Sequence, residues 1–214
     1  MLNLDQHGMI VPIRGTRTVV NRQFRGLDKG DISDGLAGIN AIIVHQTDTE
    51  NIRSVFNSYS NATNGSHFVI DKDGTIYQTA SLYKQVWHVG YVRPKCLIEH
   101  SCTDLDKQAF AQINSGGRRV RNEVKNHATH IWEKVKPYPV RYPTNADAIG
   151  IEIVGKAHGR KNHEVFENVN EAKNESLRWL IGELKQTIGK PMLETLRHPD
   201  IARKNPTEAS TASW

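Results

Sequence analysis

Residues 39–45 read Ile-Asn-Ala-Ile-Ile-Val-His (INAIIVH), and this stretch decides the fold. It follows Gly38, is short and apolar, and is rich in β-branched residues, so it predicts a buried strand. A second stretch, IGIEIV at 149–154, alternates in hydropathy and predicts another strand. Together with the helical patterns around them, these strands indicate an α/β fold with helices packed on a central sheet.

Two amphipathic helices are predicted around these strands. In residues 49–59 the apolar side chains share one helical face, with Thr49 as the expected N-cap. A longer helix is predicted over 171–188 from the spacing of its apolar residues, and Gly189 is expected to end it. The segment from 195 to the C-terminus is polar and predicts a loop.

The middle of the chain predicts a hairpin followed by an insertion. HFVID at 67–71 and TIYQ at 75–78 flank an Asp-Gly turn, which is typical of a β-hairpin. VWHVG at 86–90 predicts a further short strand. Residues 91–147 then lose the regular pattern, apart from a helix expected near 119–135.

The composition excludes several classes of protein. Hydrophobic residues make up 37% of the 214 residues, and the mean hydropathy is −0.56. No apolar run approaches the roughly 18 residues that a membrane span requires. The net charge of +5 favours anionic polymers, but no nucleic-acid motif accompanies it, so no nucleic-acid partner is expected. The N-terminal residues show no basic region followed by an apolar stretch, so a Sec signal peptide is not expected.

The chain contains two cysteines, Cys96 and Cys102. Five intervening residues are compatible with two free thiols and equally with one loop-closing disulfide. A disulfide would indicate an oxidising compartment, which without a Sec signal requires another export route. The sequence leaves both alternatives open.

Several ionisable residues are candidates for chemistry. His45 ends a predicted buried strand, and Glu152 lies within another. His198 follows in LRHPD. Each has a purely structural interpretation. The two histidines could be core or capping residues, and Glu152 could lie on a solvated face of the sheet. The alternative is a zinc site with a proton-transferring base, since partial burial raises the pKa of a carboxyl. His127 and His130 also share a helical face at a spacing compatible with a metal, although HEXXH is absent.

Five segments occur in an order that resembles a known family, the zinc-dependent type 2 N-acetylmuramoyl-L-alanine amidases, which include the peptidoglycan recognition proteins. The segments are AIIVHQT (41–47), SHFVIDKDGTIYQ (66–78), VWHVG (86–90), IGIEIVG (149–155) and RHPDIARK (197–204). The resemblance implies one amidase domain over 1–214, with its core at about 39–90 and 148–208 and an insertion at about 91–147. It also implies a mixed central sheet flanked by helices, with a zinc ion at the bottom of a substrate groove.

The resemblance places the first two zinc ligands on His45 and His198. For the third, a carboxylate ten residues after His198 matches some members of the family, and this position is Glu208. Asp200 and Asn205 remain as alternatives. Two histidines and one carboxylate leave the fourth tetrahedral position to water, as a catalytic zinc ion requires.

Further roles follow from the same resemblance. Glu152 matches the catalytic glutamate of the family, and Lys204 matches a basic residue that stabilises the oxyanion. Trp87 and His88 are expected in the substrate groove.

The implied function is hydrolysis of the peptidoglycan amide between N-acetylmuramic acid and L-alanine. Two alternatives are a recognition module that binds peptidoglycan without hydrolysis and a cytosolic amidase that recycles muropeptides. The insertion, with KPYPVRYPTN at 136–145, also resembles bacterial amidases that secretion systems deliver into competitors. That likeness implies an antimicrobial effector exported by a non-Sec route, acting in the periplasm or cell wall, with a cognate immunity or inhibitor protein as partner.

Overall fold

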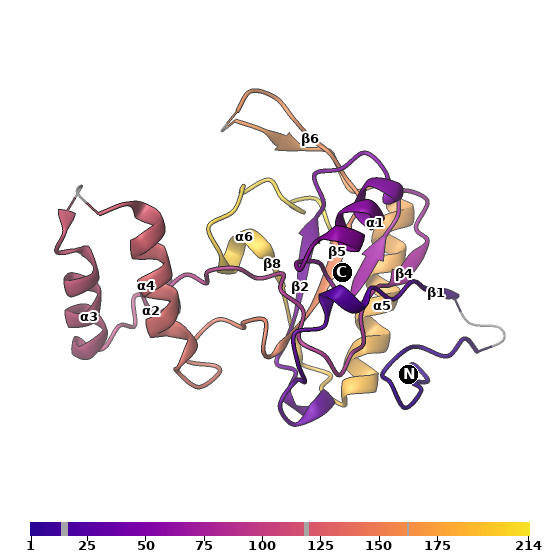
Figure 1. The fold of residues 1–214 in the computed structure, drawn as a ribbon, viewed down its shortest axis with the longest axis horizontal. Coiled ribbons are helices and arrows are strands. Elements are labelled where there is room, and N and C mark those ends of the chain that lie inside the picture. Colours follow the sequence, from indigo (N-terminus) through magenta and orange to yellow (C-terminus); the bar gives the residue numbers. More distant parts are fainter. Residues whose placement is uncertain (14–16, 118–119, 162) are drawn as a thin grey trace.

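Six strands form one sheet at the centre of the molecule (Figure 1). The computed structural model describes residues 1–13, 17–117, 120–161 and 163–214. The strands of the sheet are β1 (Val19–Asn21), β2 (Ala41–Gln46), β3 (Phe68–Ile70), β4 (Ile76–Gln78), β5 (Ala148–Ile153) and β8 (Glu194–Arg197). They lie in the order β1-β4-β3-β5-β2-β8, and only the β3–β4 hairpin is antiparallel. The predicted α/β class with a mixed sheet is therefore confirmed.

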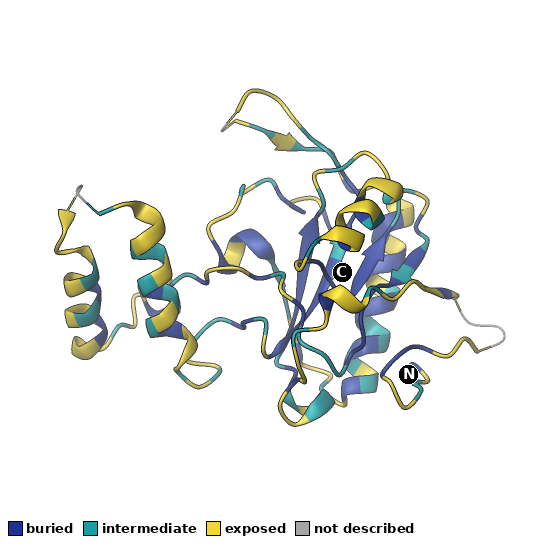
Figure 2. Ribbon diagram, in the orientation of Figure 1, coloured by how far each residue is buried: buried dark blue, intermediate teal, exposed yellow. Residues whose placement is uncertain are grey.

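One face of the sheet packs on the helix α5 (Glu171–Ile188). The Asn170 side chain accepts a hydrogen bond from the Lys173 N–H at the start of α5, and Gly189 ends the helix in the left-handed conformation. Apolar side chains of α5 are buried against those of β2 and β5. Every residue of β2 is buried, as expected for a parallel strand covered on both faces (Figure 2).

The opposite face is covered by two separate groups of elements. The helix α1 (Ile52–Asn61) packs over β3, and the short helix α6 (His198–Ile201) packs near β2. These groups form two small apolar clusters, distinct from the main core. Functional side chains of β2 and β5 emerge between them.

The N-cap of α1 differs from the prediction. Asn51, not Thr49, precedes the helix in an extended conformation, and its side chain accepts a hydrogen bond from the Ser54 N–H. The Thr49 hydroxyl instead bonds to Thr47. An Asn and a Thr are both good caps, and local bonding within the loop decides between them.

Two predictions of secondary structure are wrong. VWHVG is not a strand: it has one isolated bridge, from Trp87 to Asn64, and it lies over the sheet with Val86 and Val89 fully buried. The polar segment from 195 is not all loop, since β8 and α6 occupy its first part. β8 lies at a sheet edge, where polar residues are tolerated and the apolar signal of a strand is weak.

The insertion forms a group of helices to one side of the sheet (Figure 1). These helices are α2 (Lys95–Ile98), α3 (Asp104–Asn114) and α4 (Asn122–Lys134). Of the helix predicted at 119–135, Arg119 lies outside the described residues. A disulfide joins Cys96 of α2 to Cys102.

Asp106 joins α3 to α4. Its carboxylate completes a capping box with Thr103, accepts a hydrogen bond from Trp132 Nε1 at 3.0 Å and pairs with Lys136 at 2.6 Å. Burial raises the pKa of Asp106, but hydrogen bonds from Lys136, Trp132 and Thr103 outweigh burial and hold the pKa well below its usual range. These interactions therefore fix the orientation of α4 relative to α3.

The remaining elements are short. They are the 3-10 helices η1 (Arg25–Leu27) and η2 (Gly35–Gly38) and the two-stranded sheet of β6 (Ala157–His158) and β7 (Val165–Phe166). Among the helices of the described residues, none combines the length and the apolar character that crossing a bilayer demands.

Candidate active site

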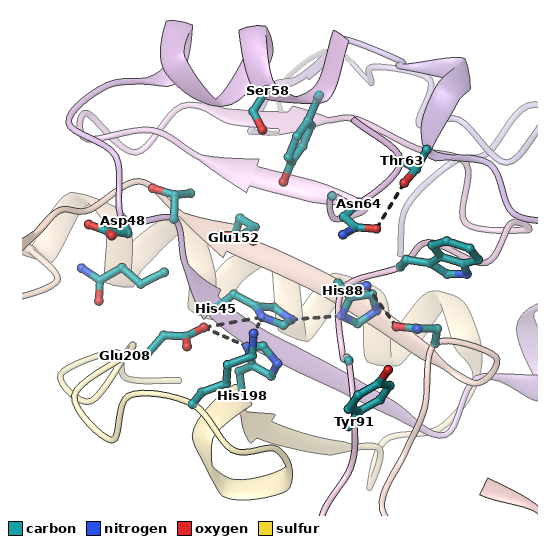
Figure 3. Close-up of a pocket in the computed structure, with 18 of the residues that line it drawn as sticks. His45, Asp48, Ser58, Thr63, Asn64, His88, Tyr91, Glu152, His198 and Glu208 are labelled. Atoms are coloured by element: carbon teal, nitrogen blue, oxygen red, sulfur yellow. Dashed lines mark hydrogen bonds and ion pairs between the residues drawn. The ribbon is translucent and has the colours of Figure 1, made fainter. Parts of the chain in front are cut away.

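His45 and Glu152 lie side by side because their strands are neighbours. In the parallel pairing of β2 with β5, His45 is the register partner of Glu152. Register partners on adjacent strands point to the same face of a sheet. This is the face opposite α5, between α1 and α6, where Figure 3 shows the two side chains.

His198 and Glu208 approach His45 from the other side. His198 begins α6 directly after β8, which pairs with β2, and Glu208 follows ten residues later. His45 Nδ1 lies 2.9 Å from His198 Nδ1, and Glu208 Oε1 lies 3.0 Å from His198 Nδ1 and 3.6 Å from His45 Nδ1 (Figure 3). All three residues are buried. Among the described residues, this is the one group of three or more His, Cys, Asp or Glu side chains close enough to bind one metal ion.

Backbone carbonyls determine which imidazole nitrogen carries the proton. His198 Nε2 lies 2.9 Å from the Val89 carbonyl oxygen, so Nε2 is the donor and Nδ1 carries the lone pair. His88 Nε2 lies 3.4 Å from the Ala148 carbonyl oxygen, which leaves His88 Nδ1 as an acceptor. His45 Nε2, 3.0 Å from His88 Nδ1, must then be a donor. The Nδ1 lone pairs of His45 and His198 therefore both face Glu208.

This arrangement fits a metal ion. Two nitrogen lone pairs and a carboxylate oxygen converge, and all three are hydrogen-bond acceptors. They need a positively charged partner between them, which can be either a shared proton or a metal ion. Burial and the neighbouring His198 lower the pKa of His45 to about 4. Burial raises the pKa of Glu208, but the His198 and His45 imidazoles outweigh burial and lower the pKa to about 2, since a proton between an imidazole and this carboxylate is held by the imidazole nitrogen. A neutral His45 and an ionised Glu208 are the protonation states that metal binding requires.

Glu152 is the unpaired carboxyl of the site. Its Oε2 atom is buried and, with Thr195 Oγ1, is one of two such side-chain atoms in the described part of the chain that lack a hydrogen-bond partner. Burial, together with the charge of Glu208, raises the pKa of Glu152 to about 8. A carboxyl with this pKa can take up and release a proton near neutral pH.

The other predicted site residues line the same groove, which has a volume of about 1130 Å³. Lys204 is exposed at its wall, and the charge of Lys204 opposes the rise in the pKa of Glu152. Trp87 is 49% exposed on the groove, with the Lys29 ammonium 5.2 Å from the centre of its ring. The structure thus brings all seven predicted residues to one groove.

The two alternatives for the third ligand are engaged elsewhere. Asp200 Oδ2 accepts a hydrogen bond from the Arg197 N–H at the start of α6. Asn205 Oδ1 accepts hydrogen bonds from the N–H and the hydroxyl of Thr207. Neither side chain belongs to the buried group of His45, His198 and Glu208.

His88 has a role that the sequence did not indicate. It was predicted to line the groove, which it does, but its ring also contacts His45. Gly150 permits this position, because a Cβ at Gly150 would lie 2.8 Å from the His88 ring. His67 is structural: its Nδ1 accepts from the Gly150 N–H, and its Nε2 lies 2.9 Å from the Lys84 carbonyl oxygen.

Two histidines and a carboxylate that converge beside a separate unpaired glutamate, in an open groove over a mixed sheet, are the groups of a hydrolase site of the metal-binding kind. The sequence matches the N-acetylmuramoyl-L-alanine amidase family over residues 35–210. The chain belongs to this family of peptidoglycan amidases, which are hydrolases, and the predicted family is confirmed.

Several solved structures are similar to this chain. AmpDh3 from Pseudomonas aeruginosa, in complex with anhydromuramic pentapeptide, is 13% identical with a TM-score of 0.52, and the match covers 96% of this chain and 61% of that one. The chain therefore spans about three fifths of that protein. The catalytic domain of XlyA is 16% identical with a TM-score of 0.48, over 87% of this chain and 88% of that one. The amidase LysC from Clostridium intestinale URNW is 18% identical with a TM-score of 0.43, over 88% and 87%. No curated protein matches the sequence.

Replacing Glu208, the predicted third ligand, tests the metal site. We expect Glu208→Gln to weaken zinc affinity at least about tenfold, because it removes the negative charge between the two imidazoles. The matched control Asp200→Asn changes a carboxylate two residues after His198 and is expected to leave the affinity nearly unchanged. Competition with a chromophoric chelator measures both, and equal losses in the two variants would reject Glu208 as a ligand.

Replacing His88 tests the hydrogen bond that orients His45. In His88→Ala, His45 Nε2 loses its acceptor, and we expect zinc affinity to fall about ten- to a hundredfold, as for other residues that orient a ligand. In His88→Asn, the amide oxygen can take the place of Nδ1, and we expect most of the affinity to return. Titration of the metal-free proteins with zinc provides the measurement. If His88→Asn is as weak as His88→Ala, the contact with His88 only fills space.

Proposed function

We propose that the amidase is zinc-dependent and hydrolyses the amide between the lactyl group of N-acetylmuramic acid and the L-alanine of the stem peptide. Membership of the family supports the substrate and the bond. The observation that carries the proposal is the convergence of the lone pairs of His45 and His198 on ionised Glu208, beside the unpaired Glu152. Two nitrogens and one oxygen are the donor set typical of catalytic zinc.

His45, His198 and Glu208 would bind the zinc ion. A bound zinc ion supplies Lewis acidity, which polarises a carbonyl and lowers the pKa of a water ligand. The protein contributes the orientation of the ligands: the Val89 carbonyl positions His198, and His88 positions His45.

Glu152 is proposed as the general base and acid. Its Oε2 has no hydrogen-bond partner among the described residues and is available to accept the proton of the attacking water and return it to the leaving amine. The ammonium of Lys204, at the wall of the same groove, is proposed to stabilise the negative charge on the scissile carbonyl oxygen.

Replacing Glu152 separates an enzyme from a recognition module. We expect Glu152→Gln to retain zinc and peptidoglycan binding but to lower turnover at least about a hundredfold, the usual contribution of a positioned base. Mass spectrometry of digested peptidoglycan would identify the products, which should be free stem peptides with an L-alanine N-terminus. Unchanged turnover would exclude Glu152 as the base. A wild-type protein that binds peptidoglycan and releases nothing would favour the recognition module.

We propose further that the protein is an antibacterial effector acting in the periplasm or cell wall. The Cys96–Cys102 disulfide supports this compartment, since disulfides persist under oxidising conditions. The resemblance of the insertion to delivered amidases supports the effector role, which requires an immunity protein in the producing cell.

Expression in a bacterial host tests this compartment. With an added export signal we expect lysis, and without it we expect normal growth, because the substrate lies outside the cytoplasm. The exported Glu152→Gln variant serves as the control. Lysis that does not depend on export would contradict the proposal and favour a cytosolic substrate.

A further inference from the structure

One wall of the groove comes from the insertion. His127, His130, Ile131 and Lys134 of α4 line the groove, and their spacing of three, four and seven residues places them on one helical face. We refer to these four residues and Tyr91 as the α4 wall. The other face of α4 packs on α3 through Trp132 and Asp106. The packing of α4 on α3 therefore holds the α4 wall in place.

Aromatic contacts order this wall. The Tyr91 ring contacts two imidazoles, with its centre 5.3 Å from that of His127 and 5.4 Å from that of His130. The Val92 N–H donates a hydrogen bond to His130 Nδ1 at 3.3 Å. These contacts join α4 to the chain that follows VWHVG and orient its side chains before any ligand binds.

The charge on this side of the groove is positive. Lys134 is exposed and makes no ion pair with any described carboxylate. Arg203 and Lys204 line a cavity of about 280 Å³ that adjoins α4, and no acidic residue contributes to it. By contrast Asp48, the acidic residue that lines the groove outside the buried site, is paired with Lys156 at 3.1 Å.

The side chains that line the opposite wall are uncharged, and the nearby Lys29 ammonium is stacked on the Trp87 ring at 5.2 Å. This wall presents the hydroxyls of Ser58 and Thr63, the amide of Asn64 and the indole of Trp87. Figure 3 shows Ser58, Thr63 and Asn64 on the far side of the buried site from Tyr91. Hydroxyl, amide and aromatic groups suit a sugar, whereas unpaired cations suit carboxylates.

We propose that the α4 wall binds the carboxylates of the stem peptide and so fixes the direction in which the substrate lies, with the sugar on the Ser58–Trp87 side. This inference rests on the proposed function and assigns the insertion a role in substrate selection. A stem peptide ends in a carboxylate, and Lys134 is the unpaired cation of α4 that faces the groove.

Two synthetic muropeptides test the inference. They share the sugar and the L-alanine, and they differ in whether the remaining carboxylates of the stem are free or amidated. We expect Lys134→Gln to raise KM for the free-carboxylate substrate about three- to fivefold, the upper part of the range for one exposed charge contact. The effect on the amidated substrate should stay below about twofold. Calorimetric binding of both muropeptides to Glu152→Gln, with and without Lys134→Gln, should show the same difference in Kd without turnover.

Lys125→Gln is the matched control, since it removes the same charge from the same helix but does not line the groove. We expect it to affect neither substrate. Equal effects of Lys134→Gln on both muropeptides, or no effect on either, would overturn the inference while the amidase function stands. If the wild-type protein cleaves neither muropeptide nor peptidoglycan, the proposed function itself fails.

Discussion

The contact on which this site depends is the close approach of three hydrogen-bond acceptors. His45 Nδ1, His198 Nδ1 and Glu208 Oε1 lie within 3.6 Å of one another in a buried position. Buried acceptors repel one another unless a cation lies among them. The free energy of binding that cation therefore opposes the cost of burying the site, and metal binding is expected to stabilise the folded protein.

The sheet supplies the geometry of this contact. β2 lies between β5 and β8 in the sheet. His45 of β2 therefore lies next to Glu152 of β5 on one side and next to His198, which follows β8, on the other. All three strands run parallel, and their carboxyl ends meet at one edge, where side chains can converge. Gly150 adds the space that His88 needs beneath His45.

The parts of the site that lie in strong local patterns could be predicted from the sequence. His45 and Glu152 lie in apolar strands, and the resemblance to the amidases supplied His198, Glu208 and Lys204. The contact of His88 with His45 could not be predicted, because it joins residues 43 positions apart and depends on a backbone carbonyl of β5. Strand β8 was missed because edge strands carry polar residues. The position of α4 was missed because its apolar pattern does not indicate which surface it faces.

The central claim is that backbone carbonyls commit both histidines to presenting Nδ1 to a metal ion. Long-range ¹H–¹⁵N NMR of the imidazoles, recorded before and after one equivalent of zinc, tests this claim most directly. We expect the Nε2 atoms of His45, His198 and His88 to carry protons in the zinc-bound protein. We also expect zinc to shift the Nδ1 resonances of His45 and His198 and to leave the His88 ring neutral. A protonated Nδ1 on His45 or His198 with zinc bound, or binding through Nε2, would contradict this claim.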